Sequence, residues 1–231
     1  MYLKLEDIAG MIDLSCVRTT SCEDEIIELI KNAQKYKIGH VAVLQCFVPL
    51  VRKMLEHDPE IKIVGNVSFP SGSDSTSIKV AQAKELVLEG CNEIDMVINV
   101  GKLRSKSYSE VEEDIRAVVE ASNKLPVKVI IETPYLTLDE IKKACEIIMN
   151  TDAAFVKTST GWTEKGTTID DIKAIKAIVG ERVKIKASGG IRDLDTLIEM
   201  YRLGTQRFGV NLVSGKRILD DCISRGGEVV I

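Results

Sequence analysis

The sequence predicts an α/β fold, namely a single (β/α)8 TIM barrel that occupies residues 1–231 as one domain. Short apolar runs alternate along the chain with longer charged segments of helical period, and no long polar linker interrupts this alternation. A length of 231 residues with 45% hydrophobic content also suits one barrel of this class. An open doubly wound sheet is the alternative, but its first turn usually carries a G-x-G-x-x-G motif, which this sequence lacks.

Eight apolar runs have the length and composition of barrel strands, and a segment that could return the chain to the next strand follows each of them. In chain order the predicted strands are residues 11–15, 40–44, 62–67, 93–98, 127–132, 154–157, 183–187 and 207–210.

The segments between these runs have helical period. Several of them open with Ser, Thr or Asp and close with Gly or Asn, which are helix start and stop signals. The clearest predicted helices are residues 23–36, 75–90, 109–123, 138–149, 169–180 and 193–204.

Composition argues against several classes of protein. A net charge of −4 does not favour a nucleic-acid-binding surface, and the densest basic run, GKLRSKS at 101–107, is expected to be an ordinary solvated loop. No window is apolar enough for a membrane span, and the first residues carry acidic groups where a signal peptide needs an apolar core. We therefore expect a cytoplasmic protein without nucleic-acid or membrane partners.

The residues that could bind a metal are few and scattered, and the sequence predicts neither a metal nor a cofactor. The six cysteines are scattered without a C-x-x-C pair, and the chain has only two histidines, His40 and His57. A zinc site normally needs such residues in clusters.

Three charged residues stand at or near strand ends, in runs that are otherwise apolar: Asp95, Lys157 and Lys186. The chemistry of such barrels takes place at the carboxyl ends of the strands. Taken singly, each residue has a structural explanation, because a carboxylate can be satisfied at a barrel end and a lysine can reach solvent along its own stem. Unpaired charges that converge on one barrel mouth are costly, however, so the three together indicate a functional site.

A pair of lysines suits covalent catalysis. A nucleophilic lysine must be neutral, and half-neutrality at pH 7 requires a shift of about 4 kcal/mol from a reference pKa of roughly 10.4. A second ammonium about 5 Å away contributes on the order of 3 kcal/mol at an effective dielectric of about 20, and desolvation can supply the rest. One of Lys157 and Lys186 is therefore predicted to be a Schiff-base nucleophile, and this argument does not decide which.

Small residues surround these lysines. The segment Thr158–Gly161 leaves room for a substrate beside Lys157. Gly189 and Gly190 follow the seventh predicted strand, and Gly209 lies in the eighth. Backbone amides in the loops after these two strands commonly cradle a phosphate.

Four segments carry a family resemblance: EIDMVINVG at 93–101, KVIIET at 128–133, FVKTSTG at 155–161 and IKASGGIR at 185–192. In order and spacing the chain resembles the deoxyribose-phosphate aldolases from about Ile12 to about Gly209. The resemblance implies a class I aldolase that needs no metal. Such an enzyme reversibly splits 2-deoxy-D-ribose 5-phosphate into acetaldehyde and D-glyceraldehyde 3-phosphate.

The resemblance also implies a role for individual residues. Lys157 would form the Schiff base, Lys186 would be the second lysine that favours the neutral amine and joins proton transfer, and Asp95 would be a general acid and base acting through a water. The substrate and phosphate site would be shaped by Ser15, Thr160, Gly161, Gly189, Gly190 and Gly209.

Three departures from the family pattern leave the acceptor substrate open. Val210, Asn211 and Leu212 stand where the family usually has small residues and serines, so Asn211 is a candidate replacement for the hydroxyl donors. Residues 40–46 read HVAVLQC, and the chain ends GGEVVI without the tyrosine tail of some members. The alternatives are a Schiff-base aldolase for a different, even unphosphorylated, aldehyde or ketose, and a non-catalytic sugar-phosphate-binding barrel. A homodimer is the expected assembly.

Overall fold

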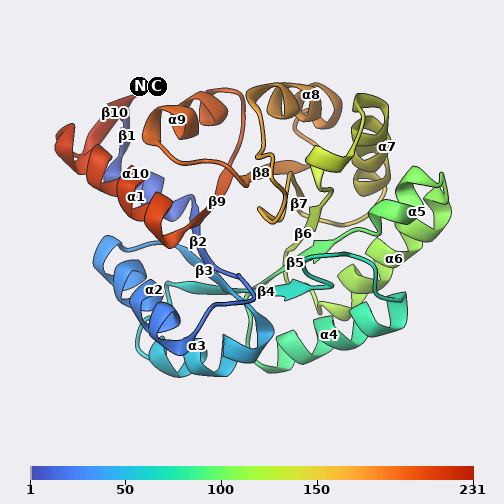
Figure 1. Ribbon diagram of the computed structural model, residues 1–231, viewed down its shortest axis with the longest axis horizontal. Coiled ribbons are helices and arrows are strands. Elements are labelled where there is room, and N and C mark those ends of the chain that lie inside the picture. The colour runs from blue at the N-terminus through green and yellow to red at the C-terminus, as the bar shows by residue number, and fades with distance from the viewer. Residues whose placement is uncertain (1) are drawn as a thin grey trace.

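The computed structural model describes residues 2–231. Within this range eight parallel strands close into a barrel in chain order, β2 to β9, and Figure 1 shows the helices arranged around it. The predicted barrel is therefore confirmed. The strands are β2 (Ile12–Cys16), β3 (His40–Val43), β4 (Lys62–Val67), β5 (Glu93–Val97), β6 (Val127–Ile130), β7 (Phe155–Lys157), β8 (Lys184–Ser188) and β9 (Arg207–Asn211).

The six predicted helices are present, with ends that differ by a few residues. They are α2 (Glu23–Tyr36), α4 (Thr76–Leu88), α6 (Tyr108–Ala121), α7 (Leu138–Met149), α8 (Ile169–Val179) and α9 (Leu194–Arg202). Side-chain caps explain why several begin where they do. Thr137 accepts a hydrogen bond from the backbone nitrogen of Glu140 at the start of α7, and Thr168 does the same with Asp171 at the start of α8.

Other elements were not predicted from the sequence. These are the helices α1 (Leu5–Gly10), α3 (Val48–Met54), α5 (Val100–Arg104) and α10 (Leu212–Ser224), the 3-10 turns η1 (Gln45–Phe47) and η2 (Thr133–Tyr135), and the strands β1 (Tyr2–Lys4) and β10 (Glu228–Val230). The prediction of a loop at 101–107 was partly wrong, because residues 101–104 belong to α5. The segment is nevertheless mostly solvent-exposed, apart from the buried Leu103.

The barrel interior contains buried charged side chains. Lys128 and Lys186 are among the largest fully buried side chains in the structure. Their strand neighbours Val129 and Ile185 belong to the hydrophobic core between the barrel and the helices. Because successive side chains of a strand point to opposite faces, the two lysines point into the barrel.

A buried ion pair fixes the strand that carries Asp95. Lys79 on α4 donates hydrogen bonds to Asp114 on α6, at 2.5 Å, and to the carbonyl oxygen of Val97 at the end of β5, at 3.1 Å. Thr76 donates to the same carboxylate at 2.9 Å. These contacts hold the carboxyl end of β5 against two helices.

No helix among residues 2–231 is long and apolar enough to cross a membrane.

Candidate active site

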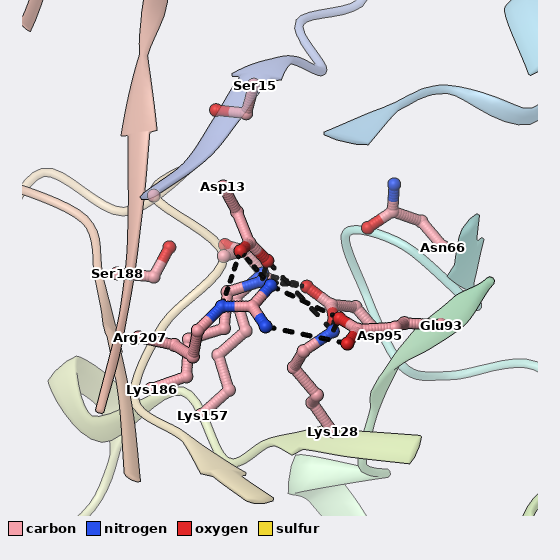
Figure 2. A network of polar contacts seen from close by, with 12 residues as sticks. Asp13, Ser15, Asn66, Glu93, Asp95, Lys128, Lys157, Lys186, Ser188 and Arg207 are labelled. Atoms are coloured by element: carbon pink, nitrogen blue, oxygen red, sulfur yellow. Dashed lines mark hydrogen bonds and ion pairs between the residues drawn. The ribbon is translucent and has the colours of Figure 1, made fainter. Parts of the chain in front are cut away.

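Asp95 is the meeting point of the two lysines singled out in the sequence. The Nζ atoms of Lys157 and Lys186 each lie 2.7 Å from Asp95 Oδ2. The two nitrogens therefore lie within twice that distance of each other. Figure 2 shows the three side chains converging inside the barrel from β5, β7 and β8.

A third lysine, Lys128, completes the coordination of Asp95. The two residues are paired across β5 and β6, and Lys128 Nζ lies 3.0 Å from Asp95 Oδ1 and 2.5 Å from a carboxylate oxygen of Glu93. The sequence interpretation missed this residue. A lysine within an apolar strand was the same signal that had identified Lys186.

Asp13 and Arg207 extend the cluster toward the amino end of the barrel. Asp13 pairs with Lys186 and with Arg207, whose guanidinium also lies 3.2 Å from Glu93. Asp13 is buried, whereas about a tenth of the Arg207 and Glu93 side chains is exposed. The sequence interpretation did not consider Asp13, although it is a carboxylate in an apolar run like Asp95.

Asp95 and Lys128 both keep their charge inside the barrel. Burial acts to raise the pKa of Asp95, but Lys128, Lys157 and Lys186 outweigh this effect and hold the pKa well below its usual value. Burial acts to lower the pKa of Lys128, but the carboxylates of Asp95, Asp13 and Glu93 outweigh it and raise the pKa. Asp95 therefore stays ionised and Lys128 stays protonated.

Lys186 behaves differently. Burial lowers its pKa from 10.5 to about 8, against the opposing effect of Asp13 and Asp95. The repulsion from Lys157 also lowers this pKa, but it contributes less than burial does. Desolvation, rather than a pair of like charges, is what brings Lys186 near neutrality.

A cavity of about 770 Å³ opens over the carboxyl ends of β2, β7, β8 and β9. All seven residues predicted to bind substrate line this cavity: Ser15, Thr160, Gly161, Gly189, Gly190, Gly209 and Asn211. Gly209 lies between the cavity and the charged interior. A Cβ at this position would stand 2.6 Å from Ser188 Oγ and 3.5 Å from Lys186 Cε, so glycine is needed for the close approach.

The loops around the cavity are tied to one another. The carboxylate of Glu132 accepts hydrogen bonds from the backbone nitrogen and the hydroxyl of Thr160, at 3.1 and 2.5 Å. Arg18 donates to the carbonyl oxygen of Gly161 at 2.8 Å and lies over the Trp162 ring. The indole nitrogen of Trp162 donates in turn to Val17. The loops after β2, β6 and β7 are therefore held together beside the cavity.

The departure noted in the sequence at Asn211 has a structural role. Asn211 Oδ1 accepts a hydrogen bond from the backbone nitrogen of Ser214 at 2.8 Å and caps α10. Only its amide nitrogen is left as a donor toward the cavity. Cationic side chains also line the cavity, among them Arg18, Arg192 and Arg217.

A second cavity, of about 850 Å³, lies between α3, β4 and the end of α4. None of the residues singled out in the sequence lines it. Its size alone therefore gives no reason to place the chemistry there.

Comparisons with known proteins agree on one family. A model of the DeoC/LacD family of aldolases matches residues 11–210. A deoxyribose-phosphate aldolase from Sinorhizobium medicae is 42% identical over 222 residues, which cover 96% of this chain and 90% of the relative. A deoxyribose-phosphate aldolase from Carboxydothermus hydrogenoformans is 42% identical over 221 residues, covering 94% of this chain and 96% of the relative.

A solved structure described as QR15, an aldolase, superposes with a TM-score of 0.89 at 36% identity, covering 95% of this chain and 97% of that one.

Proposed function

Because this chain belongs to the DeoC/LacD family of aldolases, we propose that it is a class I aldolase acting on 2-deoxy-D-ribose 5-phosphate. It cleaves this sugar phosphate reversibly to acetaldehyde and D-glyceraldehyde 3-phosphate. The observation that carries the proposal is the sharing of one Asp95 oxygen by Lys157 and Lys186 beneath a cavity lined by loops.

The reaction begins at Lys157. Its neutral amine attacks the C1 carbonyl of the open-chain sugar, and loss of water gives an iminium ion. A base removes the proton of the C3 hydroxyl, the C2–C3 bond breaks, and its electron pair moves into the iminium to form an enamine. D-glyceraldehyde 3-phosphate leaves. Protonation of C2 and hydrolysis of the resulting iminium release acetaldehyde and restore Lys157.

Asp95 and Lys186 support the proton transfers. Asp95 is ionised, so its carboxylate can take up a proton that a water relays from the substrate. Lys186, with a pKa of about 8, can carry a proton in one step and give it up in another near neutral pH.

The cavity suits the phosphorylated end of the substrate. The backbone at Gly161, Gly189 and Gly190 has positive φ angles of 78°, 87° and 82°, a conformation that glycine adopts readily. Turns of this kind present backbone amides to an anion, and we assign this role to Gly189 and Gly190 because the amide of Gly161 already donates to Ser159 Oγ at 3.1 Å. Arg18 and Arg192 add positive charge to the lining of the cavity.

One observation favours the alternative of a different acceptor aldehyde. Residues 210–212, at the end of β9 and the start of α10, offer the cavity no serine hydroxyl, and the side-chain oxygen of Asn211 caps α10. Phosphate binding would then rest on amides, on arginines and on Ser214, which lines the cavity two residues farther along α10. A panel of 2-deoxyribose with and without the 5-phosphate, read by acetaldehyde release, distinguishes the two substrates.

Trapping tests the covalent step. Borohydride with acetaldehyde should add one two-carbon unit to the wild-type chain, on the peptide that contains FVKTSTGW. Lys157→Ala should give no adduct. An adduct found on Lys186 instead would overturn the assignment of the nucleophile.

We also propose that the enzyme needs no metal, since an amine provides the electrophilic activation. Activity should survive dialysis against a chelator. Loss of activity that added zinc restores would contradict this proposal. A homodimer and a cytoplasmic location stay predictions, and light scattering of the purified chain tests the assembly.

A further inference from the structure

Asn66 is a buried amide that stands next to Asp95 inside the barrel. It lies on β4, is 7% exposed, and is paired with Asp95 across β4 and β5. The preceding residue, Gly65, faces the helices, because a Cβ there would touch the side chain of Leu86. Since successive residues alternate in direction, the side chain of Asn66 points into the barrel.

A single contact fixes the orientation of this amide. Asn66 Nδ2 donates a hydrogen bond of 2.8 Å to the carbonyl oxygen of Val43 on β3. A carbonyl oxygen can only accept, so the nitrogen must face Val43 and Oδ1 must face the other way. Figure 2 shows the amide nitrogen turned away from the charged cluster and the oxygen on the cluster side.

The oxygen of Asn66 accepts no hydrogen bond from the protein. Among residues 2–231 no donor bonds Oδ1, and this oxygen is not one of the fully buried atoms that lack a partner. It is therefore accessible to a water-sized group even though Asn66 as a residue is only 7% exposed. Each oxygen of Asp95 already accepts from a lysine, whereas Asn66 Oδ1 on the neighbouring strand accepts from none.

We propose that Asn66 is a substrate-positioning residue of the aldolase reaction, whose Oδ1 accepts a hydrogen bond from an O–H group beside the Lys157 imine. That group is either the hydroxyl of the carbon that is cleaved or the water that carries its proton. This inference rests on the proposed Schiff-base function. A water that donates one hydrogen to Oδ1 keeps its second hydrogen and its lone pairs for proton transfer between the substrate and Asp95. A substrate hydroxyl that donates to Oδ1 is held in position until its hydrogen turns toward the base.

The test compares Asn66→Leu, which keeps the approximate shape and removes both polar atoms, with Ser122→Ala. Ser122 is fully buried on the helix side and donates one hydrogen bond of 2.7 Å to Val118, so its variant also loses one buried hydrogen bond, remote from the barrel interior. Thermal unfolding shows what fraction of each variant is folded at the assay temperature. Cleavage of 2-deoxyribose 5-phosphate and borohydride trapping of acetaldehyde are then measured.

We expect Asn66→Leu to lower kcat for cleavage at least about tenfold, the loss of one oriented hydrogen bond, while the trapping rate changes less than about threefold. Ser122→Ala should match the wild type in both. A kcat for Asn66→Leu within twofold of the wild type would overturn the inference. So would a fall in trapping that matches the fall in kcat, because the residue would then support the Lys157 imine rather than the later steps.

A third measurement identifies the O–H donor. Acetaldehyde has no hydroxyl, yet its methyl protons exchange with deuterium through the enamine. If Asn66 holds a water, this exchange should slow in Asn66→Leu as much as cleavage does. If Asn66 holds the substrate hydroxyl, the exchange should proceed at the wild-type rate. A wild-type chain that gives no adduct would refute the Schiff-base function itself, which is a separate outcome.

Discussion

Lys128 binds the Asp95 oxygen that the other two lysines do not use. Its replacement by methionine would leave Asp95 and Glu93 without their shared cation in a buried site. Breaking a buried pair costs about 3–5 kcal/mol when the remaining charge has no other partner. Lys157 and Lys186 still contact Asp95, and Arg207 still contacts Glu93, so we expect Lys128→Met to lower the free energy of unfolding by less than this, measured by urea denaturation, and to lower kcat as Asp95 loses its alignment.

The double variant Lys128→Met/Glu93→Gln separates alignment from charge balance. Removing the Glu93 charge should restore part of the stability, because the carboxylate that has lost its contact with Lys128 is then neutral. If Lys128 aligns Asp95, kcat should stay low. A return of kcat to the wild-type value would mean that Lys128 only balances charge.

The titration of Lys186 should be visible in the pH dependence of kcat. Its pKa is lowered by burial to about 8, so the side chain is charged below this pH and neutral above it. If its ammonium supplies the proton for the enamine carbon, kcat should fall as the pH rises through about 8. In Lys186→Met the rate should be low and this inflection absent. A rate that instead rises through the same pH would assign Lys186 as the base for the hydroxyl.

At the scale of elements, Glu132 connects two loops at the barrel mouth. Its φ of 59° lies in the left-handed region, which costs a residue with a side chain about 1–2 kcal/mol. The two hydrogen bonds from Thr160 offset this cost. Glu132→Gly should remove the strain and the tie together, so the KM for the sugar phosphate should rise more than stability falls.

The single tryptophan, Trp162, reports on the same loop. Its backbone nitrogen donates to the Thr160 hydroxyl at 3.0 Å, so loosening Thr160 should expose the ring and shift its emission to longer wavelength. Glu132→Gln keeps one acceptor oxygen and should show a smaller shift. Unchanged emission and KM in Glu132→Gly would mean that the Arg18 contacts alone hold the loop.

The strands and long helices followed from local pattern, because apolar period and capping residues such as Thr137 act within a few positions. The short helices α1, α3 and α5 have too few residues to show a period. β1 and β10 could not be predicted for a different reason. Each three-residue strand exists only through its pairing with the far end of the chain.

The residues of the candidate site were likewise predicted only in part. Asp95, Lys157 and Lys186 were predicted because a charge in an apolar strand is visible in the sequence. Asp13 carries the same signal, but its partner Lys186 is 173 residues away, and only the closure of the barrel brings them together. Which charged side chains meet inside the barrel depends on the register of its strands, and a single sequence does not encode this register locally.

At the scale of the whole molecule, the charged interior makes stability depend on acid pH. Burial acts to raise the pKa of Glu93, but the hydrogen bond from His40 and the charges of Lys128 and Arg207 outweigh it and lower the pKa from 4.5 to about 2. A carboxylate with a lowered folded-state pKa stabilises the protein above its unfolded value, and this contribution is lost as the pH falls through the folded value.

Unfolding by urea between pH 4.5 and pH 2 tests this dependence. The free energy of unfolding should fall across this window. In Glu93→Gln it should fall less steeply, because one of the responsible carboxylates is absent. Glu60→Gln, a change at an exposed position, should keep the wild-type slope. Equal slopes in all three proteins would show that the acid transition arises elsewhere.

The pairing of Tyr2 with Val230 has a practical consequence for tethering the enzyme to a solid support. Figure 1 shows β1 and β10 side by side. α10 runs from the cavity, which its first residues line, back to β10, so this small sheet lies at the end of the barrel opposite the mouth. A resin coupled near Tyr2 or near Val230 would face away from the substrate entrance. Beads prepared through either attachment should therefore turn over substrate with the same kcat/KM.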